Sequence, residues 1–229
     1  MKLSIIIPTY NESKTIGKTL SFLLNNVENL YDTEIIVVDG GSEDTTLKIV
    51  DTYKGVKIVH SEKGRGKQMN TAVNATEGSV LYFLHADSFP PKKFDQLILQ
   101  QINNNNLAGC FKMKFDRSHW WLYLAGWFTQ FNLKFFRGGD QSLFITKELF
   151  SKQGGFVDTY SIFEDHDFIR RLYKINEFTV IQKPIITSSR RYTDNGIARL
   201  QFFYWSLYIK KWLGASNTQL EEYYKRNIR

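Results

Sequence analysis

Short apolar runs alternate with amphipathic stretches along the first hundred residues of the chain. The runs at residues 3–8, 34–38, 56–60 and 80–84 have the length and the polar boundaries of buried strands. Helices are predicted between them, with apolar residues at helical spacing: Ile16, Leu20, Leu23, Leu24 and Val27 in the first, residues 45–53 in the second, and Met69, Ala72 and Val73 in the third. This order predicts an α/β fold, with a mostly parallel central sheet and helices on both of its faces.

The second half of the chain has a less regular pattern. It predicts, in order, a polar loop, a strand, an aromatic-rich helix, the segment GGDQSLFI, an acidic helix and two aromatic helices, at residues 103–106, 110–115, 120–136, 138–145, 164–175 and 196–229. Tyr123, Trp127 and Phe131 recur every four residues, a spacing typical of a core or docking stripe, with ligand contact as the alternative.

Composition limits the class of protein. With 229 residues, of which 42% are hydrophobic, the chain can bury one substantial core, and we expect one domain. Its single cysteine, Cys110, excludes an intramolecular disulfide framework and fits a reducing compartment. Neither a signal peptide nor the roughly 18 apolar residues of a membrane-spanning helix are predicted, so a cytoplasmic location is expected. The net charge of +7 favours an anionic partner: a nucleotide-bearing substrate, nucleic acid or an anionic membrane surface.

Charged residues follow three of the predicted strands. Asp39 comes after the second strand, Arg65 and Lys67 after the third, and Asp87 after the fourth. The carboxyl ends of parallel strands share one edge of the sheet, where open α/β sheets bind their ligands. One carboxylate for a base or ribose, cations for a diphosphate and a second carboxylate for a divalent metal together predict a nucleotide-diphosphate site.

The strand end in VLYFLHADSFPP, residues 80–91, has two interpretations. His85 and Asp87 lie two positions apart, so both side chains point to one side of an extended chain and can face one ligand. Alternatively, Asp87 begins a turn and caps the helix that follows the prolines. The sequence DGGS at Asp39 has a similar alternative, a tight turn in which Ser42 caps the next helix.

Two common nucleotide-binding motifs do not fit the chain. The first predicted strand–helix turn, PTYNES, contains no glycine, which disfavours a dinucleotide fingerprint there. In the region of GRGKQM, a P-loop would need a glycine at Ser61 and a serine or threonine at Gln68. A different nucleotide-binding fold is therefore expected.

Four motifs resemble those of one enzyme family in order and spacing: SIIIPTYNES, IIVVDGGSEDTT, FLHADS and FEDHDFIRRL. They make the chain similar, over almost its whole length, to an inverting family 2 glycosyltransferase of the GT-A fold. The LHADS form and the GGDQSLFI segment most resemble a small bacterial subfamily associated with arsenosugar-type biosynthesis. The resemblance implies a single GT-A domain over residues 1–229, with a nucleotide-binding half, an acceptor half and carboxyl-terminal helices at 1–102, 103–195 and 196–229.

The resemblance also implies roles for individual residues. The nucleotide pocket would be lined by Pro8, Thr9, Tyr10 and Glu12. Asp39 would contact the base, and Arg65 would lie near the phosphates. Lys67 is a second candidate cation for the diphosphate only through its position after the third predicted strand. Asp87 would hold a divalent metal, Mg²⁺ or Mn²⁺. His85 stands where the usual motif has a first aspartate, which leaves the identity of the metal open.

Glu164 and Asp165 coincide with the family's ED motif, which implies that Asp165 is the general base, with Glu164 beside it. The chemistry needs such a base, because the attacking acceptor hydroxyl must lose a proton. The implied reaction moves a sugar from a nucleotide-diphosphate donor to that hydroxyl, with inversion and with help from the metal. The alternative is that residues 164–167 form the solvated first turn of a helix, where acids meet the helix dipole favourably.

Other functions and partners stay open. A polyprenyl-phosphate sugar transferase at the membrane surface shares the pocket, and a nucleotide-binding module on the same fold would lack catalysis. Aromatic and cationic residues after Arg199 suit single-stranded nucleic acid, but the acids around Asp165 would repel it, so no nucleic-acid partner is expected. The carboxyl-terminal helices, with Lys210 and Lys211, would dock on this domain, on a second copy in a homodimer, or peripherally on a membrane.

Overall fold

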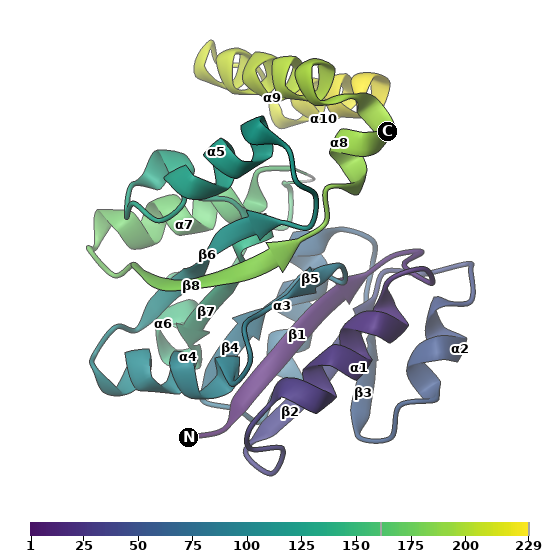
Figure 1. Cartoon of the computed structure of the whole chain (residues 1–229), viewed down its shortest axis with the longest axis vertical. Helices are drawn as coiled ribbons and strands as arrows, with labels where there is room; N and C mark the ends of the chain where they lie inside the picture. Colours follow the sequence, from purple (N-terminus) through teal and green to yellow (C-terminus); the bar gives the residue numbers. More distant parts are fainter. Residues whose placement is uncertain (161, 229) are drawn as a thin grey trace.

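In residues 1–160 and 162–228, the part of the chain that the computed structural model describes, eight strands form one mixed sheet in the order β3-β2-β1-β4-β7-β6-β8-β5 (Figure 1). The strands are β1 (Leu3–Thr9), β2 (Thr33–Asp39), β3 (Val56–His60), β4 (Val80–Phe83), β5 (Ser88–Phe89), β6 (Ala108–Phe115), β7 (Leu143–Thr146) and β8 (Thr179–Thr187). β1 pairs in parallel with β2 and β4, and β2 pairs in parallel with β3, whereas β7 runs antiparallel between β4 and β6. The predicted parallel sheet is thus confirmed in the first half of the chain.

Helices cover both faces of the sheet, as predicted. One face carries α1 (Ile16–Asn26), α2 (Thr46–Asp51) and α4 (Phe94–Asn103), and the other carries α3 (Arg65–Asn74), α6 (Lys147–Lys152) and α7 (Glu164–Lys174). Two 3₁₀ turns, η1 (Lys134–Phe136) and η2 (Gly139–Gln141), precede β7. Alternation along the strands explains the double cover: Ile5 and Ile7 pack in one core and Ile6 in the other.

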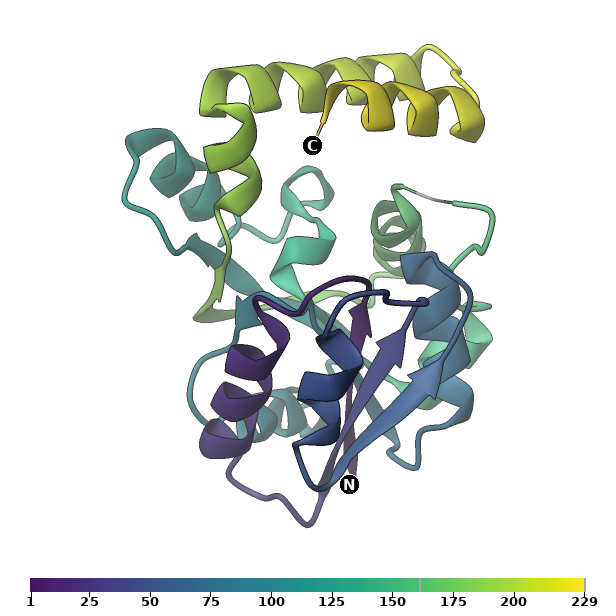
Figure 2. The ribbon, with the colours of Figure 1, turned by 90° about the vertical axis from the view of Figure 1, so that its right-hand side faces the viewer.

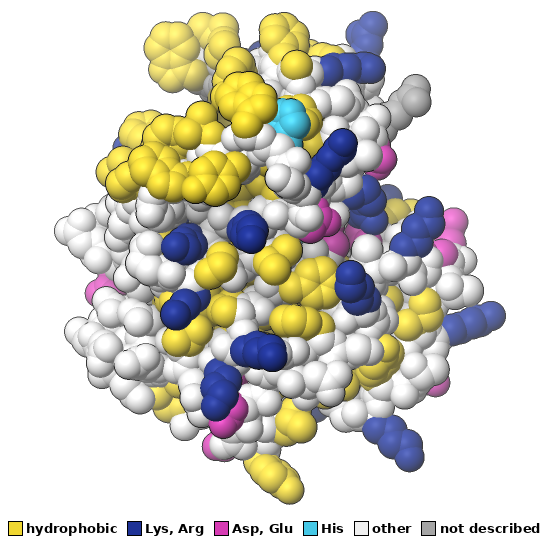
Figure 3. All heavy atoms as spheres, viewed as in Figure 1, with side chains coloured by type: hydrophobic (Ala, Val, Ile, Leu, Met, Phe, Trp, Pro, Cys, Tyr) yellow, Lys and Arg dark blue, Asp and Glu magenta, His cyan; other side chains and the backbone are white. Residues whose placement is uncertain are grey.

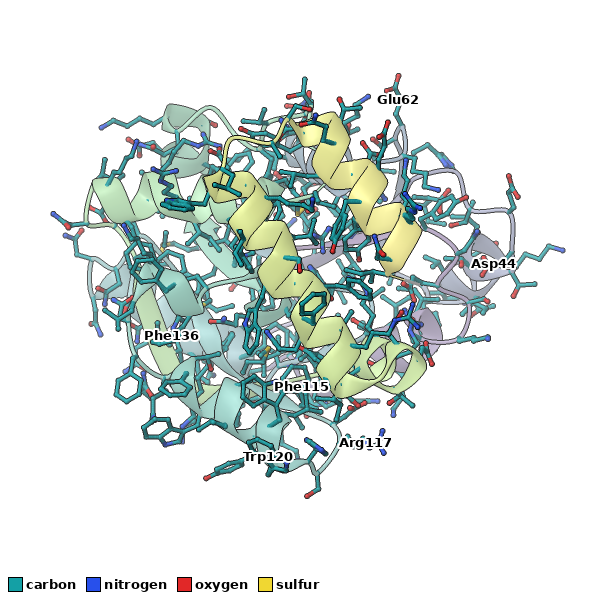
Figure 4. The ribbon with its side chains drawn as sticks, turned by 90° about the horizontal axis from the view of Figure 1, so that it is seen from above. Asp44, Glu62, Phe115, Arg117, Trp120 and Phe136 are labelled. Atoms are coloured by element: carbon teal, nitrogen blue, oxygen red, sulfur yellow. The ribbon has the colours of Figure 1, made fainter. Side chains whose placement is uncertain are left out.

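A third group of helices lies across the carboxyl edge of the parallel strands (Figure 2). It consists of α8 (Arg190–Asn195), α9 (Ile197–Trp212) and α10 (Asn217–Asn227). Figure 4 looks down on this layer, in which α9 and α10 pack against each other around Leu200, Leu207 and Leu220. Among the described helices, none combines the length and the hydrophobicity that crossing a bilayer requires. This layer covers the edge of the sheet at which the sequence predicts the ligand site.

The helix predicted at residues 120–136 ends early. α5 covers Trp120–Phe128, and a loop and the η1 turn replace the rest. The buried guanidinium of Arg137 accounts for this difference, because it donates to the carbonyls of Thr129 and Phe131 and satisfies them outside a helix. Apolar periodicity shows no such contact, so it extends the predicted helix too far.

Phe168 on α7 tests the packing that fixes the start of this helix. Its ring is fully buried against the rings of Phe150 and Phe156, so its replacement by alanine leaves a cavity. We expect Phe168→Ala to lower the free energy of unfolding by about 3–5 kcal/mol in chemical denaturation. Phe135→Ala is the matched control, because that ring is 83% exposed and its loss should change stability by less than about 0.5 kcal/mol. Equal effects of the two substitutions would contradict this packing.

Candidate active site

A cleft opens between the carboxyl ends of the strands and the helical layer above them. Its floor comes from the ends of β1 and β4 and from the start of α3, and its roof comes from the segment after β8 and from α9. Seven of the residues predicted for the nucleotide and the metal line it: Pro8, Thr9, Tyr10, Glu12, Arg65, His85 and Asp87. The structure therefore brings together, at one cleft, residues that are far apart in the sequence.

The first residues of α3 and α7 meet at an ion-pair cluster. Arg65 Nη2 lies 2.6 Å from Glu164 Oε1 and 3.3 Å from Asp165 Oδ2. The side chain of Glu164 is fully buried and that of Asp165 is 12% exposed, so the two acids do not form a solvated helix turn. Burial and the charge of Asp165 raise the pKa of Glu164, while Arg65 opposes the rise.

The Arg65 side chain separates both acids from the cleft. The guanidinium lines the cleft, whereas Glu164 and Asp165 lie behind it and do not contribute to the lining. Burial disfavours the positive charge, but the carboxylates of Asp165 and Glu164 outweigh burial and raise the pKa of Arg65. Arg65 Nη1 also lies 3.3 Å from His85 Nε2. Arg65 thus connects the predicted base to a predicted metal ligand.

Gly139, in the η2 turn, allows the backbone to pass against this cluster. A Cβ atom at Gly139 would lie 2.0 Å from Asp165 Oδ2 and 3.2 Å from His85 Nε2. A larger residue would therefore displace the carboxylate of Asp165. The GGDQSLFI segment, to which the sequence analysis assigned no site residue, supplies this close approach.

Asp87 has the properties of a ligand residue without a protein partner. It lies in the expected turn after β4, but α4 begins later, with Lys93 as its cap residue, so Asp87 does not cap it. Burial raises its pKa, and within the described chain its carboxylate makes no hydrogen bond or ion pair. A partly buried carboxylate that is not otherwise engaged suits a divalent cation.

His85 pairs with another acid of the cleft, Asp140. His85 Nδ1 is 3.4 Å from Asp140 Oδ1. The Asp140 side chain is 60% exposed. Desolvation by the surrounding cleft opposes its ionisation, but the hydrogen bond from His85 and the charges of Arg191 and Arg65 hold its pKa well below the usual range. No group of three or more acidic, histidine or cysteine side chains forms a metal cage in the residues described. A cation at Asp87 and His85 would take further ligands from diphosphate oxygens and water, as Mg²⁺ commonly does.

Asp39 lies beside the cleft and not in its lining. Its Oδ2 accepts hydrogen bonds from the backbone N–H groups of Gly41 and Ser42, each at 2.9 Å, which confirms the tight turn. Ser42 does not cap the next helix, because α2 begins at Thr46. Asp39 Oδ1 is buried and has no hydrogen-bond partner among the described residues. It is a free acceptor next to Thr9, its partner across the β1–β2 ladder.

Two groups of residues differ from the sequence-based site. Lys67 does not line the cleft, because its ammonium pairs with Glu62 at 2.6 Å on the surface. Conversely, the cleft contains residues that the sequence analysis missed, chiefly Asp140, Arg190, Arg191, Tyr192 and Tyr204. The signal for the two arginines was their position directly after β8, by the same strand-end rule that identified Asp39 and Asp87.

Known proteins share both sequence and architecture with this chain. The family model described as Glycosyl transferase family 2 matches residues 4–163. Poly(ribitol-phosphate) beta-N-acetylglucosaminyltransferase TarS from Staphylococcus aureus is 35% identical over 99 residues, which make up 41% of this chain and 17% of TarS. The chain thus matches less than two thirds of the length of this relative.

Solved structures extend the likeness to the fold. S. aureus TarS in complex with UDP superposes with a TM-score of 0.69 at 23% identity, over 82% of this chain and 60% of that one. Mannosyltransferase PcManGT from Pyrobaculum calidifontis, in complex with GDP-Man and Mn²⁺, gives a TM-score of 0.68 at 19% identity, over 97% and 69% of the two chains. The predicted GT-A fold is thereby confirmed.

A pair of neighbouring glycines tests the geometry around Asp165. We expect Gly139→Ala to push the Asp165 carboxylate away from Arg65 and to lower the free energy of unfolding by about 1–3 kcal/mol, the usual range for overpacking. The control is Gly138→Ala, whose Cβ would meet only His166 Cε1, at 3.9 Å, and which should change stability by less than about 0.5 kcal/mol. Chemical denaturation and crystal structures of both variants measure the difference. An unmoved Asp165 in the Gly139 variant would contradict the argument.

Proposed function

Because the chain belongs to glycosyl transferase family 2, we propose that its cleft transfers a sugar from a nucleotide-diphosphate donor to an acceptor hydroxyl, with inversion at the anomeric carbon. The observation that carries this proposal is the Arg65 cluster, in which one cation of the cleft faces two carboxylates at the start of α7. This arrangement offers a cation for a phosphate and a shielded carboxylate for a proton. The donor class is supported by TarS and PcManGT, whose structures contain UDP and GDP-Man.

The donor would bind along the ends of β1 and β2. Residues from Pro8 to Tyr10 line this side of the cleft, and the unpaired Oδ1 of Asp39 would accept an N–H group of the base. Arg65 would contact the diphosphate, because a guanidinium binds phosphate oxygens in a bidentate manner. Lys67 would add a second cation only after leaving Glu62, its partner in the structure.

Asp87 and His85 would hold the divalent cation, Mg²⁺ or Mn²⁺. Such an ion, when bound, neutralises the charge that develops on the departing diphosphate. Support comes from the unengaged carboxylate of Asp87 and from the Mn²⁺ in the PcManGT structure. The imidazole of His85 would contribute a nitrogen where the usual family motif has an oxygen.

Asp165 would remove the proton of the acceptor hydroxyl as the hydroxyl oxygen attacks the anomeric carbon. In the structure its Oδ2 lies 3.3 Å from the Arg65 guanidinium. A diphosphate would compete for the same guanidinium, so donor binding would draw Arg65 towards the cleft and expose Asp165 to the acceptor. Glu164, closer to Arg65 at 2.6 Å, would keep the arginine anchored during this movement.

The acceptor would enter the cleft below α8 and α9, on the side that the second half of the chain forms. Asp140 lines this part of the cleft and belongs to GGDQSLFI, the segment that resembles the subfamily associated with arsenosugar-type biosynthesis. This segment would therefore contribute to acceptor choice. A polyprenyl phosphate is the alternative acceptor, and its phosphate would find the cations of Arg190 and Arg191 on the same side.

The Asp87→Asn variant distinguishes an effect on metal binding from an effect on folding. We expect the metal-dependent part of nucleoside diphosphate binding, measured by calorimetry with and without Mn²⁺, to fall by at least about tenfold. Because burial raises the pKa of Asp87, its ionised form destabilises the native state, so the variant should be more stable than the native chain at neutral pH. That gain should shrink as the pH falls and the native carboxyl is protonated. Asp51→Asn, at an exposed position, should change neither property. Unchanged metal-dependent affinity in the Asp87 variant would remove Asp87 from the metal site.

Asp165→Asn tests the general base while keeping the size of the side chain. Transfer from a panel of nucleotide sugars should slow by about 10²–10⁴-fold, and donor affinity should stay within a few-fold. Asp167→Asn is the control, because Asp167 pairs with Arg171 at 3.1 Å on the same helix and should leave turnover near normal. Near-normal turnover in the Asp165 variant would assign the base to another group. Nucleotide binding without turnover of any donor by the native chain would favour a non-catalytic module.

A further inference from the structure

One surface of the molecule exposes large aromatic side chains, and it lies over α5 and α9 (Figure 3). We define this aromatic surface by Trp120, Tyr123 and Trp127 of α5 and Phe202, Trp205 and Trp212 of α9, each at least 45% exposed. Trp120 marks one margin of it, at the start of α5 (Figure 4). The stripe predicted from Tyr123 and Trp127 is therefore not part of the core.

The two helices form a single continuous surface. Trp121 of α5 meets Trp205 of α9 edge to face, with ring centroids 6.1 Å apart, and its Nε1 donates to Gln201 Oε1 at 3.2 Å. All five tryptophans of the chain lie in these two helices. Tryptophan and tyrosine concentrate in this way at membrane–water interfaces, where an apolar ring with a polar edge is stable.

The two segments that contain α5 and α9 carry only positive charges. Residues 117–137 and 195–220 contain no aspartate or glutamate, and they include the cations Arg117, Lys134, Arg199, Lys210 and Lys211. A second copy of the chain would bring like charges together across such a surface, which is unfavourable. An anionic partner is complementary to it, and a bilayer that carries anionic lipids matches both the aromatic rings and the cations.

We propose that the aromatic surface docks on the headgroup region of an anionic lipid bilayer. The rings of α5 and α9 would enter the interface, and the exposed cations Arg117, Lys134 and Arg199 would contact the lipid phosphates. Lys210 and Lys211, whose ammonium groups lie over the rings of Tyr223 and Phe163, would add attraction from within a Debye length of the leaflet. α9 would also connect the membrane to the cleft, since Tyr204 lines the cleft while Phe202 and Trp205 are exposed on the same helix. This docking does not depend on the identity of the sugar donor or on turnover.

Tryptophan fluorescence of the whole chain tests the proposal. The probe is vesicles of brominated phosphatidylcholine mixed with phosphatidylglycerol, because bromine quenches only nearby indoles and every indole lies on α5 or α9. We expect quenching at low salt, weaker quenching at high salt, and little quenching by phosphatidylcholine alone. Trp120→Ser with Trp212→Ser should weaken vesicle co-sedimentation, whereas Tyr31→Ser, a 98% exposed aromatic outside the surface, should not.

A matched pair of charge reversals separates local from overall charge. Lys210→Glu with Lys211→Glu should weaken partition to the mixed vesicles by about ten- to thirtyfold, as expected for the loss of two interfacial cations. Lys48→Glu with Lys54→Glu alters the net charge equally, at exposed positions on and after α2, and should have a much smaller effect.

Three outcomes would overturn the proposal. One is an absence of quenching at low salt, and another is an equal loss of partition for the two lysine pairs. The third is concentration-dependent dimerisation in sedimentation, abolished by the Trp120 and Trp212 substitutions and found without vesicle binding. That result would assign the aromatic surface to a second copy of the chain. Sugar transfer is not measured in any arm, so a failure here leaves the proposed reaction to its own tests.

Discussion

Two carboxylates buried at the start of α7 impose the main constraint on this molecule, because a buried charge is tolerated only beside an opposite one. Arg65 supplies that charge from the first turn of α3. The two helices must therefore meet at the carboxyl edge of the sheet, although they are distant in the sequence. Phe168 fixes α7 from below, and Gly139 leaves the space that the Asp165 carboxylate occupies. The core packing of α7 and the course of the backbone at Gly139 thus both hold the same ion-pair cluster in place.

Several polar groups around the cleft are costly for a protein that only has to fold. The Asp87 carboxylate is partly buried without a partner in the described chain, and Asp39 Oδ1 is a buried acceptor without a donor. Native proteins accept such costs mainly at functional sites, where a ligand satisfies the group. In the proposed function, a nucleotide base at Asp39 and a cation with a diphosphate at Asp87 would satisfy both groups. The same reasoning explains why the site combines opposite charges at close range.

The sequence predicted the first half of the fold well because apolar runs and strand ends are local signals. Arg65 and Asp87 follow parallel strands, so the strand-end rule placed them at one edge, whereas Pro8, inside β1, was indicated only by the family resemblance. Lys67 failed to join them because it lies two residues after Arg65 on a helix, roughly 200° around the axis. In the second half, the position of a residue depends on the direction of its strand, which the apolar pattern does not show. Asp140 lies at the edge because it precedes the antiparallel β7. Arg191 lies there because it follows β8, which is parallel to β6.

We infer that the cleft binds a nucleoside diphosphate together with a divalent cation. A thermal-shift measurement tests it most directly, because a ligand that binds only the native state raises the melting temperature. We expect one or more nucleoside diphosphates to stabilise the chain in Mn²⁺ or Mg²⁺, more than in chelator and more than the matching monophosphate does. Equal stabilisation by monophosphate and diphosphate, independent of the metal, would contradict it.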